Sequence, residues 1–213
     1  STPFSSPVFA IEEDHLGTIW AGYFGNGLVK LTYNSDNSDY DYFAYKNDPK
    51  NAESLSNNTI RVITEDSDKN LWVGTAFGLN KLKYDNDGSV IFQRFLNNEN
   101  DENSLSNDHV LDVYQSKNGN LYVGTFGGGL NEIRVSENNE YLFKRYTIKD
   151  GLPSDVVYQV EEDSKGNLWL MHIRGMSKLN LTSGKITFFE RNFGENFLEF
   201  RDNSMLKTSS GLI

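Results

Sequence analysis

The sequence predicts an all-β fold: a β-propeller fragment of four four-stranded antiparallel blades plus the first strand of a fifth. Two observations predict it. A repeat of about 50 residues recurs along the chain, and each copy holds four short segments rich in β-branched and aromatic residues, bounded by Asn, Asp and Gly. Such sheets cover one another's apolar faces when they stack around an axis, and radial repetition leaves only short edges.

An aromatic residue after a turn marks each repeat. It is Trp20, Trp72, Tyr122 and Trp169 in turn, at spacings of 52, 50 and 47 residues. A large ring suits the wedge between neighbouring sheets. Glycine follows two positions later in the first three repeats, which suits close approach of a neighbouring blade. The fourth repeat departs from this pattern with Met171.

The second repeat shows the expected strands most clearly. They cover residues 60–64, 71–75, 79–84 and 90–96, and their short connections make an antiparallel meander. No segment combines helical caps with a sustained 3.6-residue period. The predicted blades cover residues 5–53, 54–103, 104–150 and 151–200, and an orphan strand covers residues 201–213.

Composition excludes several classes of function. The net charge is −10, with 30 acidic and 20 basic residues, so a nucleic-acid partner is not expected. The chain has no Cys, which excludes disulfides and thiolate metal sites. No apolar stretch is long enough to span a bilayer, so we expect no membrane contact by this segment. Because it begins with Ser1, we expect the chain to be part of a longer protein.

One face of the propeller collects polar and aromatic residues. Loops that join successive blades share this face with the loops between second and third strands, and together they supply Asn, Ser, Gly and aromatic rings. These groups suit a glycan-type ligand, through ring stacking and hydrogen bonds to hydroxyls. Alternatively, the same residues are only turn formers. The candidate ligand-binding residues are Tyr23, Asn26, Asn58, Arg61, Phe77, His109, Phe126, His172 and Arg174.

Four of these candidates differ from their counterparts in other repeats or have a specific alternative. Arg61 could point into a central channel and bind a carboxylate, or it could pack locally. His109 could instead be a solvated turn residue. His172 and Arg174 occupy a loop whose sequence has no counterpart in the other repeats. This mismatch is the best local indication of a ligand-recognition site.

No catalytic, metal or cofactor site is expected. The segment Asp66-x-Asp68-x-Asn70 imitates the start of a calcium loop, but Leu71 and Phe77 occupy the positions that need Gly and Glu. The chain lacks G-x-S-x-G, H-E-x-x-H and a phosphate-binding loop with Lys.

Two long motifs carry a resemblance. Residues 54–82 (SLSNNTIRVITEDSDKNLWVGTAFGLNKL) and residues 150–170 (DGLPSDVVYQVEEDSKGNLWL) resemble two-component regulator propeller repeats. The resemblance covers essentially the whole chain. It implies the periplasmic sensor region of a bacterial hybrid two-component system, with a transmembrane helix and a histidine kinase elsewhere in the protein. Family members of this kind are associated with glycan sensing.

The leading hypothesis is therefore a non-catalytic periplasmic sensor segment that responds to an oligosaccharide or another small polar ligand. One alternative is an interaction scaffold that self-associates through open blade ends, because uncovered blade faces would expose apolar surface. Another is a lyase-like propeller enzyme, with a His and acidic residues converging near the channel.

Overall fold

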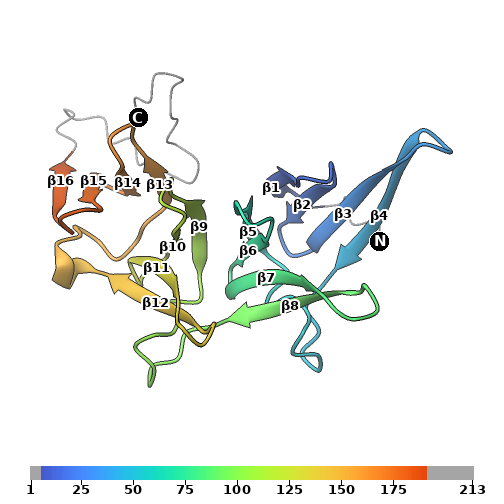
Figure 1. The fold of residues 1–213 in the computed structure, drawn as a ribbon, viewed down its shortest axis with the longest axis horizontal. Helices are drawn as coiled ribbons and strands as arrows, with labels where there is room; N and C mark the ends of the chain where they lie inside the picture. Colours follow the sequence, from blue (N-terminus) through green and yellow to red (C-terminus); the bar gives the residue numbers. More distant parts are fainter. Residues whose placement is uncertain (1–5, 191–213) are drawn as a thin grey trace. The chain divides into compact units, whose positions relative to one another are not determined.

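The structure is a computed structural model that describes residues 6–190. In this part of the chain the strands form four four-stranded antiparallel sheets, each in sequence order (Figure 1). The all-β fold predicted from the repeat is confirmed. Blade 1 contains β1 (Val8–Glu13), β2 (Ile19–Tyr23), β3 (Gly27–Asn34) and β4 (Asp39–Tyr45). Blade 2 contains β5 (Ile60–Glu65), β6 (Leu71–Thr75), β7 (Gly78–Tyr84) and β8 (Val90–Phe95). Blade 3 contains β9 (Val110–Gln115), β10 (Leu121–Thr125), β11 (Leu130–Val135) and β12 (Tyr141–Tyr146). Blade 4 contains β13 (Gln159–Glu162), β14 (Asn167–His172), β15 (Gly175–Asn180) and β16 (Ile186–Glu190).

The strands of the second repeat match their predicted positions to within one residue at each end. One element was missed: a short 3-10 helix, η2 (Ile148–Asp150), precedes blade 4. Thr147 caps it, and the Thr147 amide donates to the Asp150 carboxylate in return. The orphan strand and the predicted end of the fourth blade lie outside the described residues.

The chain divides into two compact units. Unit 1 holds blades 1 and 2 together with residues 108–110, and unit 2 holds residues 98–107 and the rest of blades 3 and 4. In unit 1, Trp20 and Leu28 of blade 1 pack against Ile60 and Ile63 of blade 2. In unit 2, Tyr122 of blade 3 occupies the equivalent place, in a cluster with apolar residues of blade 4.

The repeated glycines allow these blades to approach closely. A Cβ atom on Gly22 would lie 2.4 Å from Cγ2 of Ile60, and one on Gly124 would lie 2.7 Å from the carbonyl oxygen of Val157. Both distances are too short for real atoms. The close approach predicted from the glycine pattern is therefore confirmed.

An aspartate in the turn before the second strand orients the aromatic ring. In blade 2, the Asp66 carboxylate accepts hydrogen bonds from the amides of Asp68 and Asn70 and, at 2.8 Å, from Nε1 of Trp72. In blade 4, burial works to raise the pKa of Asp163, but hydrogen bonds from Asn167, Trp169 and a backbone amide outweigh it and hold the pKa at about 2. The carboxylates of Asp66 and Asp163 therefore stabilise their turns and fix the orientation of the Trp rings.

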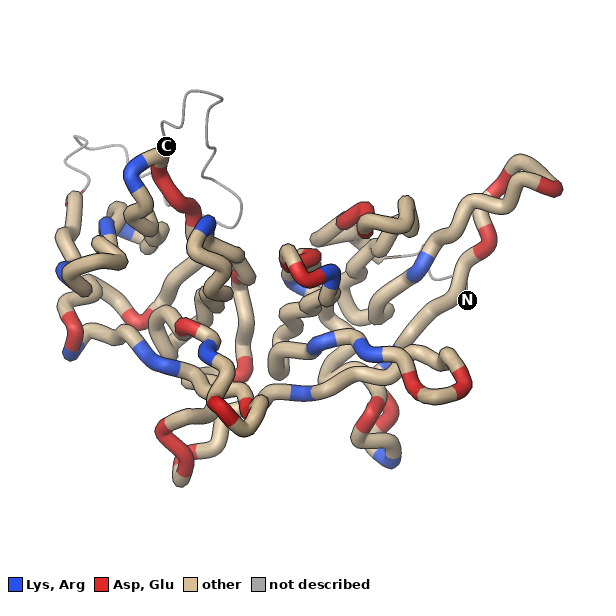
Figure 2. Tube along the Cα trace, in the orientation of Figure 1, with Lys and Arg blue, Asp and Glu red and all other residues tan. Residues whose placement is uncertain are grey.

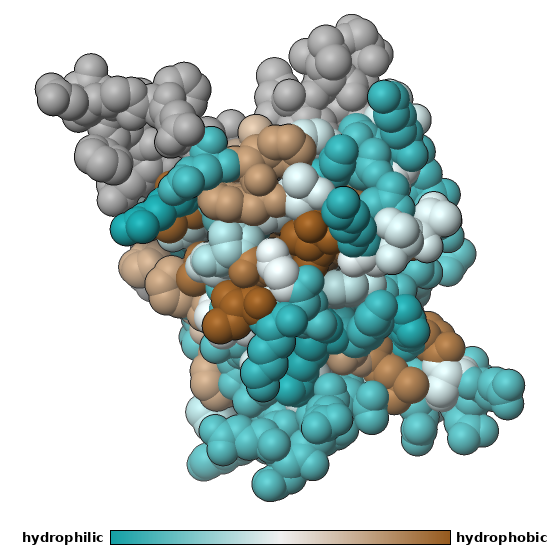
Figure 3. All heavy atoms as spheres, turned by 90° about the vertical axis from the view of Figure 1, so that its left-hand side faces the viewer, coloured by the Kyte–Doolittle hydropathy of each residue, from teal (hydrophilic) through white to brown (hydrophobic). Residues whose placement is uncertain are grey.

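The surface is mostly polar. Lys and Arg are interspersed with Asp and Glu along the trace of each unit (Figure 2). On the side shown in Figure 3, hydrophilic side chains cover much of the surface, and apolar ones show around the middle of the view.

Candidate functional site

The loops predicted to share one face lie beside each other in both units. In unit 1, the Gly27 amide donates to the Asn58 carbonyl at 2.8 Å, so the loop between β2 and β3 contacts the loop before β5. In unit 2, the amides of Gly127 and Gly129 both donate to the Asp155 carbonyl. The segments that join blades are thus tied to the tips of the preceding blade.

A buried cluster of Ser, Thr and Asn lies beneath this face in blade 2. The hydroxyls of Ser56 and Thr75 are 3.0 Å apart. Asn80 accepts the Ser56 amide at 2.9 Å and donates to the Ser56 hydroxyl at 2.8 Å. All three side chains are buried, and each bonds to another member of the cluster. The cluster therefore closes the joining loop onto the sheet.

Blade 3 repeats this cluster with Ser106, Thr125 and Asn131. Asn131 accepts the Ser106 amide at 3.0 Å and donates to the Ser106 hydroxyl at 2.8 Å. Thr125 donates to the Gly129 carbonyl, as Thr75 of blade 2 donates to the Gly78 carbonyl. The same side chains at the same register thus perform the same structural task in two blades.

Blade 4 replaces every member of the cluster. Pro153 follows the buried Leu152 where blades 2 and 3 have serine, His172 stands three residues after the aromatic ring where they have threonine, and Ser177 pairs with Leu170 where they have asparagine. His172 is only 1% exposed and Ser177 is fully buried. Within residues 6–190, neither Nε2 of His172 nor Oγ of Ser177 has a hydrogen-bond partner.

A cavity of about 340 Å³ opens at this altered position. Its volume lies at the lower end of the range for small-molecule sites, about 300–1,000 Å³. The wall combines a cation, an anion, a hydroxyl, an imidazole and an aromatic ring. The lining residues are Pro153, Ser154, His172, Ile173, Arg174, Phe188 and Glu190.

Burial favours the uncharged form of the His172 imidazole. Its Nδ1 atom lies 2.8 Å from the carbonyl oxygen of Val156. Burial lowers the pKa of His172, and the hydrogen bond to Val156 opposes the effect only in part. Arg174 is exposed at the rim and, among the residues described here, has no hydrogen bond or ion pair.

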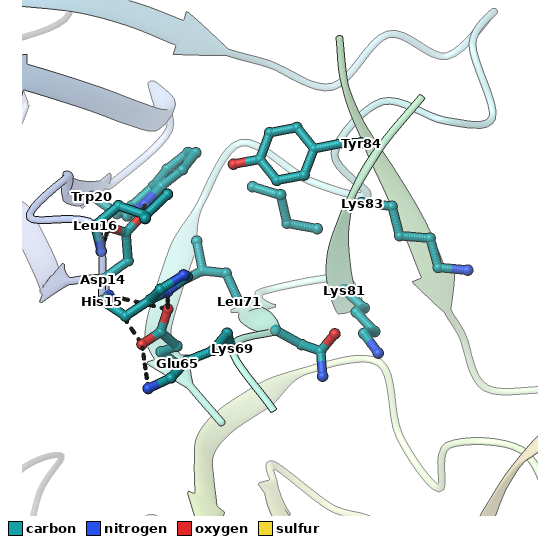
Figure 4. Close-up of a pocket in the computed structure, with 12 residues that line it drawn as sticks. Asp14, His15, Leu16, Trp20, Glu65, Lys69, Leu71, Lys81, Lys83 and Tyr84 are labelled. Atoms are coloured by element: carbon teal, nitrogen blue, oxygen red, sulfur yellow. Dashed lines mark hydrogen bonds and ion pairs between the residues drawn. The ribbon is translucent and has the colours of Figure 1, made fainter. Parts of the chain in front are cut away.

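A second hollow, of about 530 Å³, lies in unit 1 near the turns on the opposite side of the blades (Figure 4). Its polar groups are bonded to one another: Nδ1 of His15 is 2.6 Å from the Glu65 carboxylate, and Lys69 lies 3.8 Å from the same carboxylate. Figure 4 shows Lys83 pointing away from this group. This hollow therefore offers fewer free polar groups than the cavity of blade 4.

The structure divides the nine predicted residues between the two units. Tyr23, predicted as a loop residue, ends β2 and is 5% exposed, because it packs in the core of blade 1. Asn26 donates to the Ser6 hydroxyl at 2.7 Å, and Asn58 accepts the Asn47 amide at 2.7 Å. The guanidinium of Arg61 stacks 5.3 Å from the Phe9 ring centroid, which fits the local-packing alternative.

The remaining predicted residues differ in their exposure. Phe77 and Phe126 are exposed at the tips of their blades, and His109 is partly buried just before β9. His172 and Arg174 line one cavity. The prediction that His172 lies in a loop tip is wrong, because β14 continues through it and turns its side chain inward.

Sequence reasoning missed Ser154, Phe188 and Glu190 as cavity residues. The coincident loss of serine, threonine and asparagine from the fourth repeat was the available signal. Within residues 6–190, no three His, Asp or Glu side chains gather as a metal site would require, and no helix has the length and apolar character of a membrane span.

Comparison with known proteins identifies the repeat. The two component regulator propeller family matches residues 54–77, 104–127 and 151–172. The chain carries two-component regulator propeller repeats. These regulator propeller repeats coincide with the joining loops and the first two strands of blades 2, 3 and 4.

A curated relative of this chain is histidine kinase P4 of Formosa agariphila. It is 30% identical over 210 residues, which cover 94% of this chain and 14% of the relative. The extracellular domain of a protein described as a hybrid two-component system of B. thetaiotaomicron is 25% identical, with a TM-score of 0.68 over 86% of this chain and 25% of that one. The chain is thus similar to part of a histidine kinase and to the extracellular domain of a two-component protein. This chain spans about one seventh of the kinase and a quarter of the extracellular domain.

The virginiamycin B lyase of Staphylococcus aureus is a more distant neighbour. It is 14% identical, with a TM-score of 0.58 over 91% of this chain and 59% of the lyase. At this identity the likeness shows the propeller fold alone.

Proposed function

We propose that this chain is a non-catalytic ligand-input segment of a hybrid two-component sensor, placed on the periplasmic side of the inner membrane, and that it responds to a glycan-derived ligand. The observation that carries the proposal is the cavity of blade 4. There the Ser–Thr–Asn cluster of blades 2 and 3 is replaced, and a hollow is lined by Arg174, Glu190 and the buried His172.

The chemistry of the cavity supports a saccharide. The ring of Phe188 offers an apolar surface, while Arg174, Glu190 and Ser154 supply donors and acceptors for hydroxyl groups. A few polar groups set among apolar ones are typical of sites that fix the orientation of a small ligand. The kinase relative and the extracellular two-component neighbour support the sensor role.

A glycan array followed by isothermal titration calorimetry tests this proposal with the whole 213-residue chain. We expect at least one oligosaccharide to bind, and Arg174→Ala to weaken binding by about tenfold, or about 1.4 kcal/mol. Lys165→Ala, in the exposed turn between β13 and β14, is the matched control and should bind normally. The absence of binding by every saccharide on the array would refute the ligand-input function.

A second candidate function, self-association, is favoured by the outer face of blade 1. Val8 and Ile11 are 43% and 67% exposed, whereas their counterparts Ile60 and Ile63 in blade 2 are buried against blade 1. The same strand positions thus form a covered packing face in one blade and an uncovered one in the other. We propose that a second copy of the chain covers this face.

Sedimentation velocity tests this scaffold function. We expect association that increases with protein concentration and is weakened by Ile11→Lys, because a charge would have to be buried in the contact. Leu16→Lys, at an exposed turn in the same blade, is the control. A monomer at all concentrations would rule the scaffold out.

A further inference from the structure

We propose that the hollow of unit 1 shown in Figure 4, between blades 1 and 2, is a second binding site that takes an uncharged ligand with an apolar ring system. The inference goes beyond the proposed function and does not rest on it. Three observations carry it: the apolar side chains that line the hollow, the different chemistry of the corresponding positions in unit 2, and the engagement of the charged groups around the hollow.

Apolar side chains from both blades line the hollow. Leu16 and Trp20 come from blade 1, and Leu71, Leu82 and Tyr84 come from blade 2. Leu16 and Tyr84 are 72% and 57% exposed, and the other three are buried. Figure 4 shows the ring of Tyr84 extending across the hollow toward Trp20 and Leu16. The volume of about 530 Å³ lies within the range of small-molecule sites, about 300–1,000 Å³, so a ring system fits between the two walls.

Leu16 is irregular for its position in the repeat. Its amide donates to Asp14 in the turn before β2, as the amide of Asp68 donates to Asp66 in blade 2, so the turn itself does not require leucine. The other three turns have polar residues at this position, namely Asp68, Asn118 and Lys165. A ligand that covers Leu16 gives the exchange a physical reason, because it removes apolar surface from water.

Blade 3 carries a polar network at the positions that correspond to the blade 1 wall. Glu132 lies opposite Tyr122, on the face that packs against blade 4. The glutamate is 5% exposed and accepts hydrogen bonds from Arg134 at 3.1 Å and from the Tyr146 hydroxyl at 2.8 Å. Lys144 lies 3.9 Å from the same carboxylate. In unit 2 these polar groups therefore satisfy one another.

Blade 1 replaces this network with aromatic contacts. Lys30 and Phe43 occupy the places of the glutamate and the lysine of blade 3. The ring centroid of Tyr45 lies 4.8 Å from that of Phe43 and 6.0 Å from that of Trp20. Nζ of Lys30 lies over the Trp20 ring, 5.7 Å from its centroid. The wall of unit 1 thus offers aromatic surface where unit 2 has a bonded network.

The carboxylates beside the hollow are already engaged within the unit. The Asp14 carboxylate accepts hydrogen bonds from the Trp20 indole at 2.8 Å and from the Thr18 amide at 2.9 Å. The Glu65 carboxylate lies 2.6 Å from Nδ1 of His15 and 3.8 Å from Lys69. An anionic ligand would meet two negative charges, and a cationic one would have to displace these contacts. An uncharged ligand avoids both costs.

Two further lysines belong to the other face of β7. Residues alternate between the faces of a strand, so Lys81 and Lys83 lie opposite to the side of Leu82 and Tyr84. Nζ of Lys81 lies over the Trp72 ring, 5.4 Å from its centroid, and Figure 4 shows Lys83 pointing away from the hollow. These ammonium groups therefore do not make the hollow an anion site.

Two fluorescent probes of similar shape test the site on the whole chain. N-phenylnaphthylamine is uncharged, and anilinonaphthalene sulfonate adds one negative charge to the same rings. Fluorescence titration measures the dissociation constant of each. We expect the uncharged probe to bind and the sulfonate to bind at least about tenfold more weakly, because the nearby carboxylates repel it. Equal or tighter binding of the sulfonate would overturn the proposal, and so would a lack of binding by the uncharged probe.

Leu16→Asp determines whether the probe occupies the hollow. The change gives the turn the residue found in blade 2, so the melting temperature should stay within about 2 °C of the native value. We expect the affinity for the uncharged probe to fall at least about tenfold. Ile11→Asp is the matched control, because Ile11 is 67% exposed on the uncovered face of blade 1, away from the residues of the hollow. It should leave the affinity unchanged.

The outcomes are separate from those of the glycan experiment. Normal affinity in Leu16→Asp, or a loss in Ile11→Asp instead, would place the probe outside the hollow and refute the inference. If Leu16→Asp does not fold, Tyr84→Thr at the exposed end of β7 provides the same test with the same expected loss. Failure of the hollow to bind leaves the ligand-input function intact, because that function depends on the cavity of blade 4.

Discussion

Nδ1 of His172 lies 2.8 Å from the carbonyl oxygen of Val156. Val156 belongs to the segment that joins blade 3 to blade 4, so this bond ties the segment to the end of β14. In blades 2 and 3 the residue at the position of His172 is a threonine that bonds within its own turn. Blade 4 thus holds its joining segment through an imidazole, whose other ring nitrogen is buried without a partner among the described residues.

Burial of this imidazole predicts a pH-dependent stability. The pKa of His172 is lowered in the folded protein, so the unfolded chain binds the proton more readily. Stability is therefore complete above the unfolded pKa of about 6.5, and it is lost as the pH falls toward the folded pKa. The slope should not exceed about 1.4 kcal/mol per pH unit. Urea denaturation between pH 8 and pH 5 measures it, and His172→Thr should flatten the curve. An unchanged slope in that variant would assign the effect to other groups.

The buried cluster predicts opposite results for two related substitutions. Asn80→Ala should lower the free energy of unfolding by about 1–3 kcal/mol, because it leaves the buried amide of Ser56 without its acceptor and the Ser56 hydroxyl with only Thr75 as partner. Ser177→Ala occupies the equivalent position in blade 4, where the hydroxyl has no partner among the described residues, and should be neutral or slightly stabilising. Chemical denaturation of both variants provides the comparison. Equal losses would mean that the hydroxyl of Ser177 is bonded.

Two aspartates in one turn form a matched pair. Asp66 accepts bonds from Trp72 and from two backbone amides, whereas Asp68 is exposed. Asp66→Ala should cost about 1–3 kcal/mol, since the buried indole N–H would lose its acceptor. Asp68→Ala should remain within about 0.5 kcal/mol of the native protein. Thermal unfolding measures both, and a similar loss in the two variants would contradict the role given to Asp66.

The contact between blades in unit 2 predicts a steric effect at Gly124. An added Cβ would lie 2.7 Å from the carbonyl oxygen of Val157, and a backbone atom cannot turn aside as a side chain can. Gly124→Ala should therefore destabilise the protein by about 1–3 kcal/mol, as overpacking of a core does. Thr182→Ala, in an exposed turn of the same unit, serves as the control in a denaturant titration. If Gly124→Ala unfolds at the same denaturant concentration as the native protein, the blades can separate slightly to make room for the added methyl group.

Much of the fold could be predicted because it depends on local patterns. The aromatic residues, the turns before them and the glycines after them recur in order, so strands and blade contacts follow from spacing. The shared face of the joining loops followed from the alternation of connections. The 3-10 helix was missed because three residues leave almost no periodic signal.

The candidate site could be predicted only in part. His172 and Arg174 were singled out because they interrupt a repeat. The orientation of His172 toward solvent or the interior depends on where β14 ends. The end of a strand is set by packing against neighbouring segments, which the sequence pattern does not reveal. Phe188 and Glu190 carry no signal of their own, since their place beside the cavity depends on the register of β16 against β15.

The sequence by itself determined that the chain is a repeated four-stranded sheet with one irregular copy, because strand period, turn residues and repeat spacing act over short distances. Only the tertiary structure decided what the irregularity does. Hydrogen-bond partners such as the carbonyl of Val156 come from segments distant along the chain, so which buried polar atom is bonded and which lacks a partner among the described residues emerges only when the blade is packed.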